Sequence, residues 1–490
     1  MLNRRWVSTL GFVALVVIFS SAARQLHAKP VAPAALCQSY GKTKTCEGGP
    51  PACTLCHSVA PARNAFGQQV SEHLAVSVPR PLTDQQFLQA IQTALKAIER
   101  MDADKDGVDN LSEIEQGSHP ADAASQPLAP GCSAQQISAS SRSRWNVCRY
   151  DPVFAFRRIH LDFCGTSPSW AEVAEFSKLV RDRRQWEPAL ARQLDRCLSS
   201  RYWLGKDGVV WNLANPKIRP IDSVKSGPDS GPVPLADYYF DYDLFTWANS
   251  GDRDVRDLLL AQYFVKRVSD NPPSFRVLSE EELKKLPLGS GQNVPPAKRA
   301  GMLTTRWFTT VNTMFTAIPR TTAAQAYRAY LGFDISHMEG LHPVPNEPAE
   351  YDRKGVTAPT CAFCHSTLDP LAYPFSRYNG IFRNDFAPDR LKSFVRIEGP
   401  DVVRTPEKGV LFGKEVKDLL EFAQVAANSP EFARNVVRDY WKLLIGREPQ
   451  AQDQPEFGAL WRGLMDPQKF NYRVEKMLHA LVLTEAYGRP

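Results

Sequence analysis

The sequence has few of the features that mark membrane, nucleic-acid-binding or nucleotide-binding proteins. After the first 28 residues, no apolar run approaches the roughly 20 residues that a membrane-spanning helix requires. No stripe of Lys and Arg with interleaved aromatic residues occurs, and a formal net charge of +6 over 490 residues is mild. Phosphate loops and the G-x-S-x-G nucleophile elbow are also absent. We therefore expect neither a membrane span in the mature chain nor a nucleic-acid partner.

Strand patterns are sparse as well, whereas apolar residues at helical spacing are frequent. Residues 83–101, TDQQFLQAIQTALKAIERM, show this spacing after Thr83, a suitable N-cap. Another N-cap, Ser167 or Ser169, precedes a helix that ends near residue 182. We expect a mainly α protein with irregular connections. Further predicted helices cover residues 151–165, 186–203, 252–268, 415–428, 429–447 and 471–487.

The N-terminal stretch has the layout of a secretory signal peptide. A basic start, MLNRR, precedes the short apolar run WVSTLGFVALVVIF, and SSAARQLHA then offers small residues for cleavage after Ala23 or Ala28. We expect residues 1–28 to be removed and the mature chain to be exported to the periplasm or the cell surface. An uncleaved N-terminal anchor is the alternative. Export would place the ten cysteines in an oxidising compartment.

One five-residue pattern, C-x-x-C-H, occurs twice, as CTLCH at 53–57 and as CAFCH at 361–365. It is typical of covalent haem c attachment, because two thiols one helical turn apart can add to the two vinyl groups of one haem while the adjacent histidine binds the iron. A redox disulfide, half a zinc site or one four-cysteine zinc site would explain the cysteines but not both histidines. We expect two haem c groups, held by Cys53, Cys56, His57, Cys361, Cys364 and His365.

Six cysteines lie outside these two motifs. An even number of remaining cysteines in an exported chain indicates disulfides, although a free buried cysteine is an alternative for any of them. The simplest pairing joins sequence neighbours. It predicts Cys37–Cys46, Cys132–Cys148 and Cys164–Cys197.

Each haem iron has a second axial position that the motif itself does not fill. A methionine there raises the reduction potential, a second histidine lowers it, and an open position permits ligand chemistry. We predict Met101 for the first haem, because the chain after His57 is long enough to return a ligand to the far face, and Met338 for the second. Core packing for a methionine and solvation for a histidine are the alternatives. Other candidates are His73, His119, His337, His342, Met465, Met477 and His479.

A twelve-residue acidic loop, DADKDGVDNLSE, directly follows Met101. Side-chain oxygens fall at positions 1, 3, 5, 9 and 12, and a glycine falls at position 6, which is the layout of a calcium loop. The apolar residue stands at position 7 instead of 8, and this register resembles the short calcium repeats of thrombospondin-type and related bacterial modules. An Asx-rich surface turn is the alternative. We expect one Ca²⁺, bound by Asp102, Asp104, Asp106, Val108, Asn110 and Glu113.

The order of motifs and linkers divides the chain into modules. A cytochrome c-like module with the calcium loop is expected at 29–125, and a Ser-, Ala- and Pro-rich linker at 126–148. A helical domain is then expected at 149–350, followed at 351–490 by a helical C-terminal domain with the second haem motif.

Several stretches of residues 150–490 resemble a bacterial family of exported c-type cytochrome proteins, abundant in planctomycetes and myxobacteria, whose domains are mostly of unknown function. They include FRRIHLDFCGTSPSWAEVAEF, GMLTTRWFTTVNTMFTAIPRTTAAQAYRAYLG, CAFCHSTLDPLAYPFSRYNGIFR and SPEFARNVVRDYWKLLIGREP. The resemblance implies haem binding at the second motif and no established reaction. Many relatives carry an Arg and a His shortly before that motif; here EYDRKGVTAPT supplies Arg353 but no His.

These features lead to one main functional hypothesis and two alternatives. The main hypothesis is an exported dihaem cytochrome that transfers electrons to or from a redox partner protein. The first alternative is a dihaem oxidase, dehydrogenase or peroxidase-like enzyme with one catalytic haem and a small-molecule substrate; the large region between the motifs favours it. The second is a calcium-dependent binding or assembly protein. Six-coordinate haems that ignore CO and peroxide would favour the carrier, and one five-coordinate haem would favour the enzyme.

Overall fold

The computed structural model covers most of the chain between residues 31 and 489. The expected signal peptide, the linker at 126–148 and the Cys132–Cys148 pair lie outside the described residues. The described ranges are 31–47, 49–59, 62–74, 82–123, 125, 150–219, 236–287, 293–313, 316–380, 385–395 and 404–489.

The protein is mainly α, as the sequence predicts. Its described strands form three separate two-stranded antiparallel sheets. The strands are β1 (His57–Val59), β2 (Ala62–Arg63), β3 (Val265–Asp270), β4 (Pro273–Val277), β5 (Gly409–Leu411) and β6 (Lys414–Val416). The shorter helical turns are η1 (Cys53–Leu55), η3 (Pro296–Lys298), η4 (Gly301–Thr304), η5 (Tyr327–Leu331), η6 (Ile335–His337), η7 (Tyr373–Phe375), η8 (Arg390–Ser393) and η9 (Ala451–Asp453).

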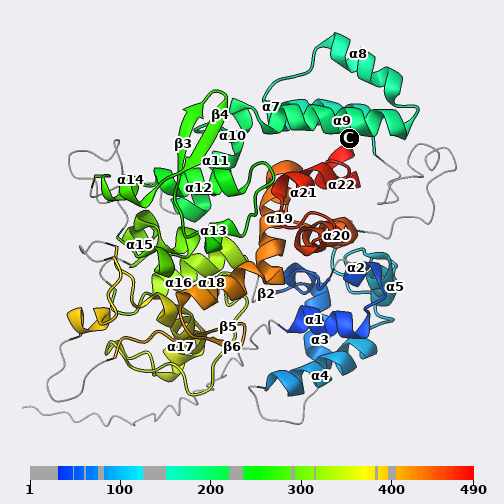
Figure 1. Ribbon diagram of the computed structural model, residues 1–490. Coiled ribbons are helices and arrows are strands. Elements are labelled where there is room, and N and C mark those ends of the chain that lie inside the picture. Colours follow the sequence, from blue (N-terminus) through cyan, green and yellow to red (C-terminus); the bar gives the residue numbers. More distant parts are fainter. Residues whose placement is uncertain are drawn as a thin grey trace, which may run out of the picture.

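The α-helices fall into an N-terminal group and a larger group after residue 150 (Figure 1). The first comprises α1 (Ala32–Ser39), α2 (Lys44–Glu47), α3 (Ala65–His73), α4 (Asp84–Ala97) and α5 (Asn110–Gln116). The second comprises α7 (Pro152–Cys164), α8 (Trp170–Leu179), α9 (Arg183–Leu198), α10 (Arg201–Leu204), α11 (Val209–Ile218), α12 (Tyr239–Ala248), α13 (Asp257–Leu260), α14 (Glu280–Lys284), α15 (Arg306–Thr313), α16 (Arg320–Ala326), α17 (Pro359–Ala372), α18 (Leu419–Ala427), α19 (Pro430–Ile445), α20 (Gln454–Met465), α21 (Val474–Leu481) and α22 (Glu485–Gly488).

Each group has its own hydrophobic core. The N-terminal core gathers Leu55, Phe66, Ile91 and Leu95 from η1, α3 and α4. The larger core runs without interruption from α7 to α22 and includes fully buried aromatic side chains on both sides of the second haem motif. Among these are Phe163, Trp203, Phe308, Phe432, Trp441 and Tyr487.

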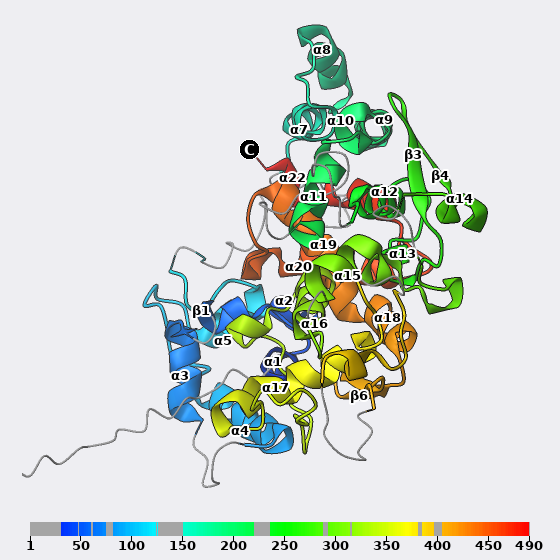
Figure 2. The same ribbon diagram turned by 90° about the vertical axis from the view of Figure 1, so that its left-hand side faces the viewer.

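The N-terminal group packs against α20, beneath it in both views (Figures 1 and 2). Gly49, just after α2, lies so close to the Trp461 ring that an added Cβ would stand 2.5 Å from it. Ala451 of η9 belongs to the N-terminal core. Ser125 donates its hydroxyl to the Gln452 side chain at 3.0 Å. These contacts bring the first haem motif close to the C-terminal helices.

The predicted caps are confirmed, and three predicted helices differ from the structure. Thr83 caps α4 and Ser169 caps α8, each in a capping box with the residue three positions on. Residues 186–203 are divided between α9 and α10, and residues 471–487 between α21 and α22. Residues 252–268 do not form one helix; α13 ends at Leu260 and β3 begins at Val265. The backbone N–H of Arg267 donates to the buried Asp243 carboxylate at 2.8 Å, and β3 pairs with β4, so tertiary contacts override the helical spacing there.

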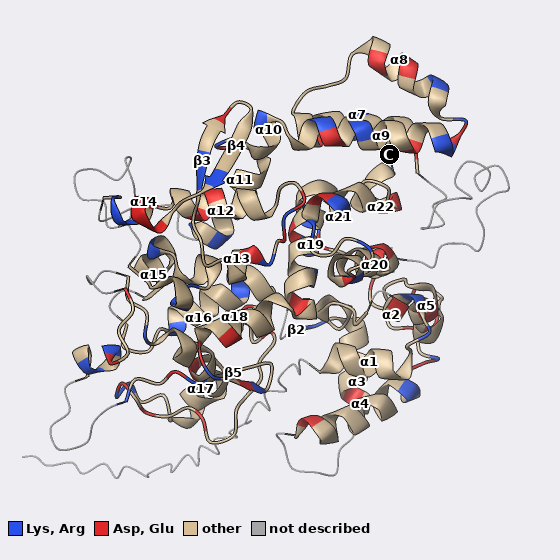
Figure 3. Cartoon of the chain, viewed as in Figure 1, with Lys and Arg blue, Asp and Glu red and all other residues tan. Residues whose placement is uncertain are grey.

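The helices are short and mixed in charge. Within the described ranges, none has both the length and the apolar character needed to cross a membrane. Both α8 and α9 carry basic and acidic residues (Figure 3).

Candidate haem and calcium sites

The cysteines separate into two chemical groups. Cys37–Cys46 and Cys164–Cys197 are disulfides, which confirms two of the predicted pairs. The four cysteines of the two C-x-x-C-H motifs are free thiols in the same structure. Neither motif therefore forms its own disulfide, although the chain forms disulfides elsewhere.

The second motif lies in the first turns of α17. Cys361, Cys364 and His365 are spaced three and four residues apart on this helix, so they share one face. Cys361 is exposed and Cys364 is partly exposed, while the His365 side chain is 24% exposed. All three side chains are thus accessible from the same side, as attachment of a haem requires.

Three buried charged groups stand behind His365. Its Nδ1 lies 2.8 Å from Oδ1 of Asp369, one helical turn further along α17. Arg320 of α16 donates two hydrogen bonds to Asp369, at 2.7 and 2.9 Å, and two more to Asp352, at 2.6 and 3.1 Å. The hydrogen bond assigns the ring proton to Nδ1 and leaves Nε2 with the lone pair that binds a metal.

The first motif is a tight turn held by α3. η1 spans Cys53–Leu55, and the Cys56 N–H donates to the Cys53 carbonyl at 3.1 Å, so one helical turn separates the thiols here too. His57 begins β1. The Asn64 side chain, which caps α3, donates to the carbonyls of Thr54 and Leu55, both at 3.0 Å. The turn is therefore fixed from outside the motif.

Charges from the C-terminal helices reach the first motif. Burial raises the pKa of Cys53; the Glu339 carboxylate raises it further, and Arg434 and Arg438 of α19 lower it. Burial and the neighbouring Cys53 raise the pKa of Cys56 to about 12. Both thiols are thus partly buried, and charges of α19 act on Cys53.

Arg434 is the most deeply enclosed of these cations. Burial lowers its pKa to about 10, and its guanidinium lies 6.0 Å from the centre of the Phe457 ring. The Arg438 charge lowers this pKa further, whereas Cys53 and Glu431 raise it. A largely desolvated cation whose charge acts on a C-x-x-C-H motif would suit an anionic haem propionate.

One short segment is linked to both motifs, to one by charge and to the other by a hydrogen bond. The Glu339 charge acts on Cys53, and the Val344 N–H donates to the Ser366 carbonyl at 2.9 Å, next to His365. Five residues span at most about 18 Å when fully extended. One loop is therefore hydrogen-bonded beside the second motif and carries a charge that acts on the first.

A polar cleft lies along the same loop. It holds about 260 Å³ and is lined by residues of η6, of the following loop and of α19, including Glu339 and Arg438. Charges of both of these residues act on Cys53 of the first motif.

The predicted axial ligands have different surroundings. Met101 is partly buried against the N-terminal core, as is Cys56. Met338 packs against the larger core at φ +57°, directly before Glu339. His119 uses both ring nitrogens on backbone groups, the Thr54 carbonyl at 3.0 Å and the Ala121 N–H at 3.1 Å. It therefore fastens the first motif's turn.

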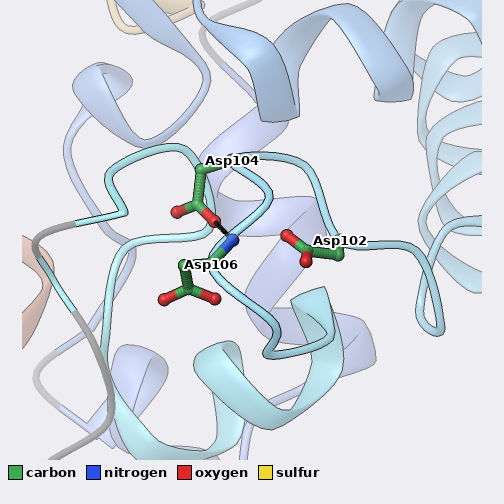
Figure 4. A group of neighbouring side chains, drawn as sticks. All are labelled: Asp102, Asp104 and Asp106. Atoms are coloured by element: carbon green, nitrogen blue, oxygen red, sulfur yellow. Dashed lines mark hydrogen bonds between the residues drawn. The ribbon is translucent and has the colours of Figure 1, made fainter.

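The acidic loop brings three carboxylates together. Oxygens of Asp102, Asp104 and Asp106 lie within 4.8 Å of one another (Figure 4). Lys105 and Gly107 have φ of +65° and +94°, which turns the loop around these side chains; at Gly107 no atom crowds an added Cβ, so the positive φ is the reason for glycine.

Glu113 of α5 is a fourth carboxylate whose charge interacts with those of Asp104 and Asp106. Its side chain is fully buried, and its Oε2 has no hydrogen-bond partner in the described structure. The same holds for Oδ2 of Asp104 and of Asp106. Burial, with the charges of Asp104 and Asp106, raises the pKa of Glu113 to about 8. Buried anionic oxygens without donors fit a hard cation.

Asn110 has a structural role in the loop. Its Oδ1 accepts from the Ala103 N–H at 3.2 Å, and its amide donates to Gln69 and to the Ile98 carbonyl, each at 2.9 Å. These bonds close the loop, and the ligand role of Asn110 stays a prediction. For Val108, the N–H donates to Asp106 at 2.8 Å.

Sequence reasoning missed Asp369, Arg320 and Asp352. The signal available was the spacing HSTLD, which places a carboxylate one helical turn after a histidine. Arg320 and Asp352 come from other elements and have no local signal. Among the described residues, the acidic loop holds the one close group of three or more metal-ligating side chains, so the four thiols do not gather into a zinc site. No protein-family model, curated protein or solved structure matches the chain.

Proposed function

We propose that this protein is an exported dihaem c-type cytochrome that transfers electrons. The observation that carries the proposal is that the four thiols of two C-x-x-C-H motifs stay free in a chain whose other described cysteines form disulfides. The disulfides are typical of an oxidising compartment, which supports export. The likeness to bacterial exported cytochromes over residues 150–490 agrees with the same proposal.

Each motif has side chains suited to binding a haem. A bound haem supplies a one-electron iron couple. Cys361 and Cys364 offer thiols on one helical face, and His365 offers Nε2 for the iron because Asp369 engages Nδ1. At the first motif, His57 follows the thiols directly, and Arg434 offers a partly buried positive charge for a propionate.

The loop between Glu339 and Val344 supports transfer between the two haems. It is hydrogen-bonded beside the second motif and carries a charge that acts on Cys53 of the first, which supports a path for an electron between the two haems. A redox partner protein of unknown identity would then need to approach only one of the two sites.

The acidic loop supports a bound Ca²⁺ in the same proposal. Asp102, Asp104, Asp106 and Glu113 offer the oxygens, and the loop directly follows Met101, which packs near Cys56. The ion would order the segment that carries Met101 and so stabilise the surroundings of the first haem.

The polar cleft beside Glu339 and Arg438 favours a second candidate function, a dihaem redox enzyme. A small polar substrate could reach the first motif through it. Addition of CO to the reduced protein separates the two functions: unchanged spectra of both haems support the carrier, and a shift of one spectrum supports the enzyme.

Paired cysteine variants test the main proposal. Replacing Cys361 and Cys364 by Ala should leave one covalent haem per chain, and replacing Cys53 and Cys56 should do the same. The matched control replaces the disulfide partners Cys164 and Cys197, which should lower stability by about 2–4 kcal/mol and keep both haems. Full haem content in either motif variant would reject the proposal.

A further inference from the structure

Burying the three charged side chains behind His365 is unfavourable if they only hold the fold together. The Asp369 side chain is fully buried, Asp352 is 2% exposed and Arg320 is 14% exposed. Removing such charges from water costs several kcal/mol for each ion, and well-packed apolar residues often replace buried ion pairs without loss of stability. Two carboxylates and one guanidinium also leave a formal charge of −1 in this group. The arrangement points to a role beyond holding α16 against α17.

We propose that Asp369, held by Arg320 and Asp352, makes His365 a strongly electron-donating iron ligand and keeps the second haem at a low reduction potential. This inference rests on the proposed haem at the second motif. Asp369 acts through His365 and is a positioning residue. Its contact with His365 is the 2.8 Å hydrogen bond to Nδ1.

Two physical effects act in the same direction. A carboxylate that accepts the Nδ1 proton in a hydrogen bond raises the basicity of the other ring nitrogen, which strengthens the bond to the more positive, ferric iron. The group's net negative charge in a region of low dielectric also stabilises the extra positive charge of the ferric state. Both effects lower the reduction potential.

The group also fixes the orientation of the imidazole. Arg320 grips both oxygens of Asp369, so the carboxylate cannot rotate away from Nδ1. Asp352 fixes the guanidinium from the other side with two further hydrogen bonds. The His365 ring therefore keeps one tautomer and one direction.

The test is a spectroelectrochemical titration of the full-length holoprotein. In Asp369→Asn, which keeps the shape and removes the charge, one of the two midpoint potentials should rise. The reduction equilibrium of that haem should shift at least tenfold, about 59 mV for one electron. The other midpoint should stay in place. The control is Asp385→Asn, which removes a carboxylate of similar burial from a bidentate pair with Arg306 and should move neither midpoint.

Asp352→Asn is the second variant. It leaves the hydrogen bond to His365 in place and removes a charge further from the iron, so the same midpoint should rise by less. If Asp369→Asn does not fold, this variant decides alone, and an unmoved midpoint overturns the inference. Equal shifts in Asp369→Asn and Asp385→Asn also overturn it. Absence of covalent haem from the wild-type protein would instead reject the proposed function, so the two failures are distinct.

Discussion

The backbone N–H of Val344 donates to the carbonyl of Ser366 at 2.9 Å, and Ser366 directly follows His365. The same loop, five residues earlier, carries the Glu339 charge that acts on Cys53. One loop is thus hydrogen-bonded beside the second C-x-x-C-H motif and carries a charge that acts on the first. This relationship is the basis for proposing a relay instead of two independent carriers on one chain.

Electron exchange between the haems should therefore be intramolecular. After rapid photochemical reduction of one haem, the redistribution of the electron should follow a single rate that does not depend on protein concentration. A dilution series over about a hundredfold range checks this, because a bimolecular rate between diffusing proteins would fall with dilution. A rate that scales with concentration would contradict the shared-loop arrangement.

Glu113 should be the residue on which calcium affinity depends most. Glu113→Gln removes a buried charge from the carboxylate group and should weaken Ca²⁺ binding at least tenfold, about 1.4 kcal/mol. Isothermal calorimetry on the holoprotein measures this. The matched control is Glu115→Gln, an exposed carboxylate on the same helix, α5, which should leave the affinity unchanged.

Calcium removal should also change the first haem. A chelator should alter the spectrum or midpoint potential of one haem and leave the other, because the loop precedes α5 and follows Met101 in the N-terminal core. If both haems keep their spectra and potentials after chelation, the ion has no part in ordering the Met101 segment.

Gly67 should be intolerant of alanine although it lies within α3. An added Cβ would stand 1.9 Å from the carbonyl oxygen of Cys56, whereas alanine usually stabilises a helix by about 1 kcal/mol relative to glycine. Gly67→Ala should instead destabilise the protein by about 1–3 kcal/mol and disturb the first haem alone. Thermal unfolding with haem spectra tests this, and a stabilised variant would show that α3 does not pack on the motif.

Glu456 should make stability depend on pH. Burial raises its pKa to about 8 in the folded protein, above the ordinary value of 4.5. Between these values the unfolded chain has lost the proton and the folded protein retains it, so the free energy of unfolding falls as pH rises. The slope contributed is about 1.4 kcal/mol per pH unit. Between pH 5 and pH 8, denaturant titrations should show a smaller fall in the free energy of unfolding for Glu456→Gln than for the wild-type protein. Equal falls would show that the Glu456 carboxyl is in contact with water.

The sequence predicted the parts of the structure that depend on local signals. Thr83 and Ser169 cap their helices because hydroxyl side chains satisfy free N–H groups at a helix start. The Cys37–Cys46 and Cys164–Cys197 disulfides join neighbours in sequence. Gly107 turns the acidic loop as its position predicts.

What the sequence did not predict depends on tertiary contacts. The strand at Val265 forms because β4 and the Asp243 carboxylate supply its hydrogen bonds. Asn110 closes the loop because Ala103, Gln69 and Ile98 surround it. Arg320 reaches Asp369 from another helix, and no spacing in the sequence connects the two.

The most direct measurement is the mass of the mature polypeptide after unfolding in acid and organic solvent. Non-covalent haem leaves a chain under these conditions, whereas thioether-bound haem remains. We expect the intact chain to carry the mass of two haem groups and to keep its red colour. A colourless chain with the mass of the bare amino-acid sequence would contradict the account.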